Sequence, residues 1–530
     1  MGIENLPEIE AGVTTVKPST SNEDAEPQEN YLHGVKIVML TTALMSGLFT
    51  IALDSSIIST AIPRITSDFK SLDDVAWYGA AYLLTQMSLQ PSFGRVYILF
   101  PVRNTFIVAQ LIFEIGSIIC AIAPSSIVFI IGRAVAGISA SGMYSGLMAI
   151  MRHTVETKKR PLVVSITGSV YAISGVLGPL LGGLLTDSKL TWRFCFWLNL
   201  PFGALSIAIV IWTVKIPSTS IGLTLRQKLE RLDFLGALFL VSAITCLMLA
   251  LQWGGILYPW SYPSVWGCLL GFGSIIILFI LSQAYLKERA MIQGRIINQR
   301  TVISSSLYII FLQLGMTTQT YFMPFYFQAV KETSAAVSGL HTLPYGITIA
   351  ICSLISGTLV TKFGHYVPLV WIGTSLFTVG SALLTTLTTK SSFGAWFSFE
   401  VISGAGYGLS QQISFIAVQN VLAADDSVMG VSFVIFGQSL GGSLGLSIGQ
   451  NKLSTSLSQM LKKIPGVDAA AVIRAGATKI QSVVPATLLG SVLEAYDVAL
   501  TKVFVLCAVG GGMALLCSLG LEWKKVDKRT

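Results

Sequence analysis

The sequence predicts an all-α polytopic membrane protein, with two similar six-helix bundles and two further helices inserted between them. Fourteen transmembrane helices follow from that count. Of the 530 residues, 53% are hydrophobic and only 11% are charged, whereas soluble domains carry roughly 25% charged residues. The apolar residues form runs long enough to cross a bilayer, which takes about 20 residues of helix. Short motifs also recur at a nearly constant offset between the two halves of the chain.

The apolar runs are separated by short polar or charged gaps, and one tight turn at 123–125 divides the third run from the fourth. Each run is long enough for one membrane-spanning helix. The predicted spans are 36–61, 75–97, 104–124, 126–150, 162–186, 194–214, 233–252, 264–286, 301–328, 336–361, 367–388, 393–420, 428–452 and 501–521.

The spans divide the chain into five regions. The first is a disordered cytosolic tail, because its residues are polar, acidic and rich in Pro, Ser and Glu. A long external loop, with segments around 454–463 and 468–481 that are expected to be helical and amphipathic, lies within the last bundle. The regions are the tail at 1–35, the N-terminal six-helix bundle at 36–214, the linker with two transmembrane helices at 215–300, the C-terminal six-helix bundle at 301–521 with its loop at 453–500, and a cytosolic tail at 522–530.

Basic residues concentrate in alternate gaps between the spans. One set of gaps and the C-terminal tail hold 19 Lys and Arg residues, and the other short gaps hold six. Lys and Arg are enriched in cytoplasmic loops, so both termini are expected in the cytoplasm. An even number of spans agrees, because it places the two termini on the same side. This distribution explains the net charge of +8 without a nucleic-acid partner.

Two pairs of motifs reveal an internal repeat. GRVYILFPVRN from Gly94 resembles GTLVTKFGHYV from Gly357, at an offset of 263 residues. GRAVAGISASG (132–142) aligns with FEVISGAGYGL (399–409) at an offset of 267, which matches Arg133 to Glu400. Internal repeats of this kind build many secondary transporters, whose solute site lies near the membrane midplane between the halves.

Four charged residues lie well inside predicted spans, away from the span ends: Asp54, Glu114, Arg133 and Glu400. A charge at the membrane centre costs about 2.5–3.5 kcal/mol on insertion scales, and such residues usually face a protein interior or a wet cavity. A carboxylate that changes its protonation as the cavity changes face would suffice for proton coupling. The alternative is that these residues form structural ion pairs or reach the membrane interface.

The fifth span combines glycines with a proline in SGVLGPLLGGLLTD (174–187). Small residues at helical spacing let two helix backbones approach closely, and Pro179 would bend or weaken the helix. We expect a contact that serves as a gate between the two halves; tight packing without motion is the alternative. The residues concerned are Gly175, Gly178, Pro179, Gly182 and Gly183.

From about residue 35 to residue 520 the chain resembles the fourteen-span drug:proton antiporter branch of the major facilitator superfamily. LDSSIISTAIPRI (53–65) is similar to the signature of the first span, with Asp54 at its acidic position. Arg133 matches the arginine of the R-x-x-x-G motif in the fourth span, which the resemblance implies in proton transfer. Gly178, Pro179, Gly182 and Gly183 match the antiporter motif of the fifth span, whose first glycine position holds Ser174, next to Gly175. This match implies export rather than uptake.

The loop after the second span departs from the usual family pattern. It keeps Gly94, Arg95 and Arg103, but Ile98 stands where the family has an acid, and Thr361 occupies the matching place in the second half. The resemblance therefore does not extend to an ion pair at this loop that would close the cytoplasmic side. The variant G-[KR]-x-Y-x-x-[FY]-P-[IV]-[KR] is similar to fungal toxin and secondary-metabolite efflux pumps.

Other functional classes lack support in the sequence. There is no G-x-x-x-x-G-K-[ST] motif for ATP, and the seven cysteines have neither metal-site nor disulfide-framework spacing. The sequence shows no nucleophile–base pair of the kind that would indicate an enzyme. We therefore expect no cofactor and a proton gradient as the energy source.

The expected function is proton-coupled export of an amphipathic organic compound, a fungal toxin or other secondary metabolite. The expected partners are the lipid bilayer, the organic substrate and protons, and the chain is expected to act as a monomer. We expect the plasma membrane, with the vacuolar membrane as the alternative. A same-fold carrier for basic amino acids or metal chelates, and a non-transporting receptor, remain alternatives. Polar residues within spans that could line the cavity are Gln86, Gln319, Tyr407 and Gln412.

Overall fold

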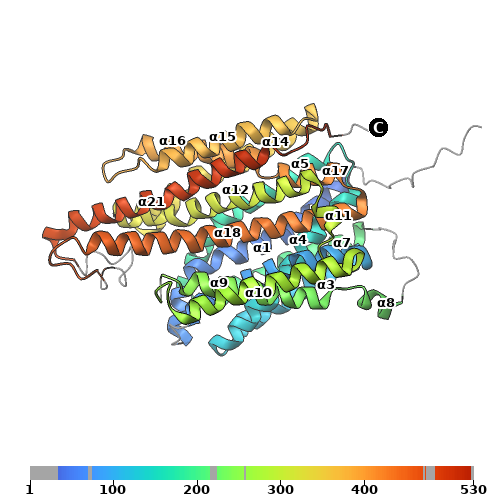
Figure 1. Ribbon diagram of the computed structural model, residues 1–530, viewed down its shortest axis with the longest axis horizontal. Helices are drawn as coiled ribbons and strands as arrows, with labels where there is room; N and C mark the ends of the chain where they lie inside the picture. The colour runs from blue at the N-terminus through green and yellow to red at the C-terminus, as the bar shows by residue number, and fades with distance from the viewer. Residues whose placement is uncertain are drawn as a thin grey trace, which may run out of the picture.

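The structure is a computed structural model that describes residues 34–69, 74–214, 224–255, 258–469, 472 and 484–526. Within these residues the regular structure is helical, apart from two isolated β-bridges. The long helices run side by side, close to the long axis of the molecule (Figure 1). We call the end of the bundle where Val526 lies the terminal end, and the opposite end the distal end.

The first half contains five long helices and a sixth that is broken at Leu198. Prolines lie inside α2 and α5; a membrane segment tolerates them because neighbouring helices and local adjustments satisfy the freed backbone groups. The helices are α1 (Val35–Phe69), α2 (Val75–Leu99), α3 (Val102–Ile122), α4 (Ser126–Thr154), α5 (Arg160–Asp187), α6 (Phe194–Trp197) and α7 (Asn199–Thr213).

The two long helices that separate the halves in the sequence, α9 and α10, pack on each other at the periphery of the first half (Figure 1). The window of 18 apolar residues in the second of them is only 11% buried, so almost its whole circumference is available to lipid. The middle segment comprises α8 (Leu225–Glu230), α9 (Phe234–Trp253), α10 (Pro263–Leu286), a 3₁₀ turn (Lys287–Arg289) and α11 (Gly294–Ile297).

The second half repeats the arrangement of the first, with more interruptions. Its helices are α12 (Arg300–Phe325) followed by a π-helical turn (Tyr326–Val330), α13 (Ala335–His341), α14 (Leu343–Phe363), α15 (Val367–Leu384), α16 (Phe393–Ser410), α17 (Ile413–Val421), α18 (Ala424–Leu461) and α21 (Ala486–Ser518).

Twelve helices among the described residues are long and apolar enough to cross a membrane. The predicted spans 75–97 and 393–420 are also helical, as α2 and as α16 with α17, but they are not among the twelve. Polar side chains such as Gln90 and Glu400 lower their hydropathy. The all-α polytopic fold is thus confirmed, whereas the count of fourteen stays a prediction.

The predicted loop at 453–500 is shorter than expected, because both flanking helices continue into it. α18 runs on to Leu461, and α21 begins already at Ala486. At 1.5 Å per residue, α18 is about 57 Å long, and the two helices project together at the distal end (Figure 1). The amphipathic segment 454–463 is therefore largely a continuation of α18, whereas most of 468–481 lies outside the described residues.

Both predicted tails lie partly outside the described residues, which begin at residue 34 and end at residue 526. The described part of the C-terminal tail is held against the second half. The backbone N–H of Val526 donates to the carbonyl of Gly364 (2.8 Å). The hydroxyl of Tyr366 donates to the carbonyl of Glu522 (2.9 Å).

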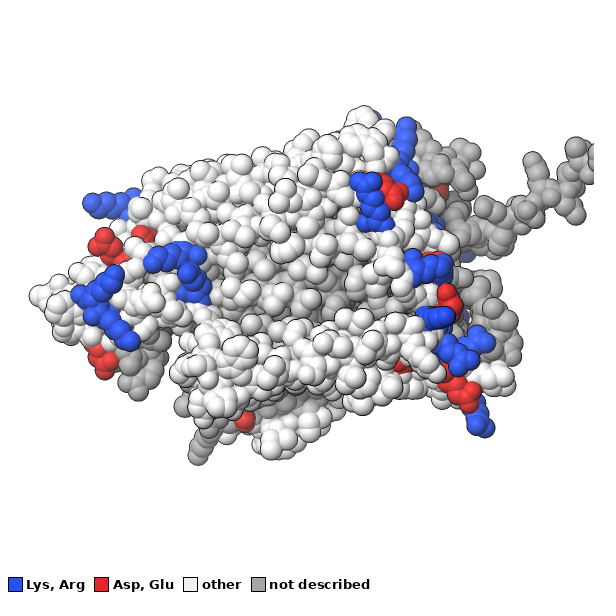
Figure 2. All heavy atoms as spheres, in the orientation of Figure 1, with Lys and Arg blue, Asp and Glu red and all other residues white. Residues whose placement is uncertain are grey.

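Charged residues gather at the two ends of the molecule and leave an apolar band between them. Figure 2 shows Lys, Arg, Asp and Glu clustered at both ends of this face, with an uncharged surface between the clusters. The side chains exposed within the band are large apolar ones, such as Leu270, Ile277 and Leu281 of α10. Since lipid-facing surfaces are apolar and charges lie at the membrane boundary, the chain is a multi-pass membrane protein.

The two halves meet along two helix pairs, α5 with α14 and α2 with α18. The hydroxyl of Ser169 donates to the carbonyl of Ala350 (2.7 Å), and the hydroxyl of Ser353 donates to the carbonyl of Ser165 (2.8 Å). At the terminal end, the guanidinium of Arg152 donates to the carbonyl of Gln419 (2.8 Å). Polar contacts therefore bridge the halves.

Candidate functional site

A buried ion pair joins α1 to α4 inside the first half. Nη1 of Arg133 lies 2.5 Å from Oδ2 of Asp54, and each side chain is only 1% exposed. Nε–H of Arg133 donates to the backbone carbonyl of Tyr78 (3.0 Å), and the guanidinium lies 4.5 Å from the centre of the Tyr82 ring. The two charges that sequence analysis singled out separately thus form one neutral unit.

Asn199 extends this polar cluster to α3 and α7. Its Nδ2 donates to Oγ of Ser117 (3.1 Å) and, over a longer distance, to Oδ1 of Asp54 (3.4 Å). The amide therefore binds the carboxylate oxygen that does not contact Arg133. Sequence reasoning did not select Asn199, although a lone Asn within the apolar run FWLNLPFG is a usable signal.

Glu114 of α3 lies beside the same cluster but has a different environment. Nε2 of Gln110 donates to its Oε1 (2.9 Å), while its Oε2 has no hydrogen-bond partner among the described residues. Gly203 of α7 packs directly on this carboxylate, so that a Cβ atom at position 203 would collide with it. The carboxylate thus fills the space that the glycine leaves open.

The glycines of the fifth span pack against α1, in the same half of the protein. Cβ atoms at Gly178 or Gly182 would collide with Ser56 and Thr60 of α1, respectively. The hydroxyl of Ser56 donates to the carbonyl of Ser174 (3.0 Å). The contact lies less than two helical turns from Asp54.

This arrangement differs from the expected gate between the halves. Within α5, Ser165 and Ser169 contact α14 of the second half, whereas Gly175 and Gly183 have no neighbour within 4 Å of a Cβ position. Pro179 lies between the glycines that face α1. The physical reason is that one face of α5 contacts α14 of the second half, while another face contacts α1 of the first half.

The packing reproduces the internal repeat. Gly94 lies against Ser432, and its repeat partner Gly357 lies against Ser165. Each contact joins the two halves, and the serines are themselves related by 267 residues, the offset that also relates Arg133 to Glu400. Two symmetry-related glycine–serine contacts therefore define the boundary along which the halves meet.

The basic residues of the loop motif show no ion pair within the described residues. Nη1 of Arg103 donates to the carbonyl of Val214 over 3.5 Å, and the buried Nε of Arg95 has no hydrogen-bond partner there. An ion pair nearby instead joins the linker to α18, with both Asp426 oxygens accepting from Arg295 at 2.7 and 2.9 Å. These hydrogen bonds and the charge of Asp426 raise the pKa of the Arg295 guanidinium.

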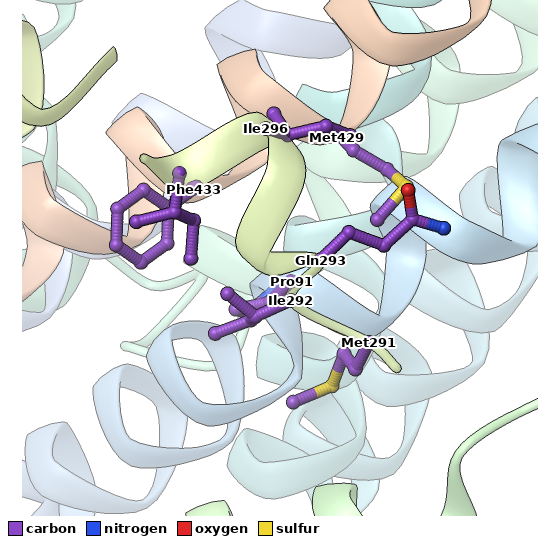
Figure 3. Close-up of a pocket in the computed structure, with 8 residues that line it drawn as sticks. Pro91, Met291, Ile292, Gln293, Ile296, Met429 and Phe433 are labelled. Atoms are coloured by element: carbon purple, nitrogen blue, oxygen red, sulfur yellow. The ribbon is translucent and has the colours of Figure 1, made fainter. Parts of the chain in front are cut away.

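The linker segment beside this ion pair lines a small pocket between α2 and α18. The cavity measures about 10 Å³, close to the space of one water molecule. Figure 3 shows that the linker supplies one wall and that Pro91 and Phe433 come from the two flanking helices. The pocket is too small for an organic substrate and marks close packing. Its lining comprises Pro91, Met291, Ile292, Gln293, Ile296, Ile297, Met429 and Phe433.

Of the predicted cavity residues, three lie in the second half and bind other polar groups. Nε2 of Gln319 donates to Oγ of Ser403 (2.7 Å), and the hydroxyl of Tyr407 donates to Oε1 of Gln313 (2.7 Å). Gln412 lies against Gly168 of α5, at the contact between the halves.

The fourth predicted cavity residue and the last intramembrane acid are also buried. Gln86 of α2 is 8% exposed and Glu400 of α16 is 1% exposed. Neither Oε1 nor Oε2 of Glu400 accepts a hydrogen bond from a described side chain. Glu400 is far from the other acids along the chain, and the structure does not bring it to the Asp54–Arg133 pair.

The fold is that of a multi-pass helical membrane protein with an internal repeat, and comparison with known proteins gives the family. The Major Facilitator Superfamily model matches residues 44–446. The chain therefore belongs to the major facilitator superfamily, a family of transporters.

Individual relatives agree with this assignment. The chain is 42% identical over 519 residues to the MFS-type transporter ltbE of Aspergillus luteorubrus, covering 97% of this chain and 95% of that one. It is 39% identical to the aspyridones efflux protein of Neocamarosporium betae, covering 93% and 88%. These relatives confirm the resemblance to fungal efflux pumps. The human organic anion transporter MFSD10 shares the fold, with a TM-score of 0.57, 14% identity and coverage of 90% and 100%.

Proposed function

We propose that this protein is a proton-coupled efflux transporter that exports an organic small molecule, a fungal secondary metabolite, from the cell. The buried Asp54–Arg133 pair is the observation that carries the proposal of proton coupling. Export is supported by the relatives named as efflux proteins. The exported class is supported by the relative named as an aspyridones efflux protein.

Coupling follows from the cost of separating the pair. Protonation of Asp54 removes the negative charge, but the guanidinium of Arg133 stays charged at any physiological pH. A buried charge that loses its partner costs about 3–5 kcal/mol. Arg133 must then find another acceptor or move toward water, so a proton on Asp54 favours a different arrangement of α1 and α4.

The surroundings of the pair can transmit this change. Asn199 holds the second oxygen of Asp54 and links it to α3. Gly178 and Gly182 let α5 lie directly on α1, less than two turns further along from Asp54. A shift of α1 would therefore reach α5, and through Ser165 and Ser169 of α5 it would reach the second half.

The proposed orientation places the terminal end in the cytoplasm, because most of the basic loop residues belong to that side by the positive-inside rule. Protons would enter from the distal end and the substrate would leave there. The plasma membrane is the proposed location, and the protein is proposed to act as a monomer without a cofactor.

The test compares retention of the compound in cells. Deletion of the gene should raise the amount of compound held inside the cells, and a protonophore should do the same in the wild type. Asp54→Asn should behave like the deletion when export is normalised to the amount of the protein in the membrane. Normal export by Asp54→Asn, or export that a protonophore does not affect, would remove the proposed coupling.

A further inference from the structure

Glu400 is a buried acid without a cationic partner. Within the described residues it takes part in no ion pair, and no side chain there hydrogen-bonds to its carboxylate. The main chain of Tyr345, at the start of α14, is a polar neighbour. An ionised carboxylate in such surroundings costs several kcal/mol, so the group calls for a positive ligand from outside the chain.

The internal repeat shows what occupies the matching place in the first half. Gly137 packs on the backbone carbonyl of Tyr82, and 267 residues later Gly404 packs in the same way on that of Tyr345. Four residues before each glycine, on the same helix face, stand Arg133 and Glu400. Glu400 therefore occupies in the second half the place that the arginine has in the first.

The partner from the neighbouring helix differs as well. In the first half, α1 supplies Asp54, and the two opposite charges cancel. In the second half, α12 supplies the neutral amide of Gln319, which donates to Ser403 of α16. The second half thus keeps one uncompensated acid where the first half has a neutral pair.

The space around Glu400 admits only a small ligand. A Cβ atom on Gly404 would lie 2.8 Å from the carbonyl oxygen of Tyr345, and one on Gly380 of α15 would collide with the main chain of Ser403. The side chain of Glu400 is 1% exposed. Helices this close leave no room for an organic cation, whereas a proton needs none.

The titratable groups near Glu400 come from α13, α14 and α21. Tyr345 belongs to α14 and Cys507 of α21 lies near it, whereas α15 contains no titratable residue. His341 of α13 stacks on Trp396, with the ring centres 4.7 Å apart. Trp396 precedes Glu400 by one helical turn, so the partly buried imidazole lies between the acid and the distal surface.

We propose that Glu400 is a proton-binding site of the second half, separate from the Asp54–Arg133 pair and occupied in this conformation. The proton adds to a carboxylate oxygen as an O–H bond, and no other bond changes. If the proposed export is proton-coupled, this site supplies a second proton position per transport cycle; its existence does not depend on that coupling.

Infrared spectroscopy of the purified full-length protein tests the proposal with protons as the only ligand. A buried protonated carboxyl group has a carbonyl band that disappears when the group ionises. The wild type should lose such a band as the pH is raised. Because Glu114 is a second buried acid with an oxygen that has no hydrogen-bond partner among the described residues, Glu400 is assigned the part of the band that is missing in Glu400→Gln and retained in Glu114→Gln, in Asp54→Asn and in the exposed Glu494→Gln.

A second variant covers the case in which Glu400→Gln fails to fold. Glu400→Asp keeps an acid at the site on a shorter stem and should shift the band rather than remove it. A spectrum that is unchanged in Glu400→Gln, or in Glu400→Asp when only that variant folds, overturns the proposal. Because no transport is measured, this result is independent of whether the protein exports its substrate with protons.

Discussion

Gly94 of α2 packs directly against Ser432 of α18, at the boundary between the two halves. A Cβ atom on Gly94 would lie 3.0 Å from the Cβ atom of Ser432 and 3.2 Å from Cα of Met429. The related contact of Gly357 with Ser165 joins α14 to α5 in the same way. If the halves rock against each other, these two contacts are where their backbones must slide or separate.

Adding a methyl group at this contact should impair transport. We expect Gly94→Ala to reduce the transport rate several-fold, because overpacking costs about 1–3 kcal/mol and shifts the backbone. Ser432→Gly in the same chain should restore much of the rate by making room. Gly273→Ala is the matched control, since position 273 of α10 has nothing within 4 Å. Equal rates for Gly94→Ala and Gly273→Ala would contradict the role of this contact.

The Asp54–Arg133 pair should show strong coupling in a double-mutant cycle. Asp54→Asn and Arg133→Gln should each lower the free energy of unfolding by about 3–5 kcal/mol, because each leaves one buried charge alone. The double variant should be more stable than the sum of these losses implies. Thermal unfolding of the four purified proteins measures the coupling, and strictly additive losses would show that the pair is not formed in the membrane.

Gly203 should be required for the position of Glu114. Gly203→Ala places a methyl group against the carboxylate, so we expect a lower melting temperature. Combining it with Glu114→Ala should recover stability, because the larger side chain is then absent. Gly267→Ala, at an exposed position of α10, is the control for the glycine-to-alanine change. A stable Gly203→Ala variant, with Glu114 intact, would argue against this contact.

The Arg295–Asp426 pair should contribute little to stability and should weaken with salt. The arginine side chain is 58% exposed and the aspartate 21%, and exposed pairs are worth about 0.2–1 kcal/mol. Arg295→Ala should therefore shift the unfolding free energy by less than about 1 kcal/mol at low salt and by less still at high salt. The charge-swapped chain, Arg295→Asp with Asp426→Arg, should recover the loss. A large, salt-independent loss would indicate another role for Arg295.

The sequence contains most of the information on the fold, because membrane helices are defined locally by length and hydropathy. The motif offsets of 263 and 267 residues also predicted the repeat, which reappears in the packing of Gly94 and Gly357. The extent of α18 and α21 could not be predicted from hydropathy, although the amphipathic pattern at 454–463 indicated helix where α18 ends. Both helices continue beyond their apolar segments, where hydropathy no longer reports the helix.

The site was predicted less completely, since its parts come from distant segments. Asp54 and Arg133 could each be selected as charges within an apolar run, but their pairing depends on how α1 and α4 pack. The spacing of Gly178 and Gly182 indicated a close helix contact without naming the partner, which is α1. The donor role of Asn199 likewise depends on tertiary packing, because it joins side chains 82 and 145 positions away.

Transport by the purified protein in sealed vesicles tests the central claim most directly. With the exported compound on both sides, an imposed pH difference should drive its accumulation on the side with the higher proton concentration, and removal of that difference should abolish accumulation. Asp54→Asn should show no pH-driven accumulation. An undiminished steady-state gradient without a pH difference, a membrane voltage or another ion gradient would contradict the account.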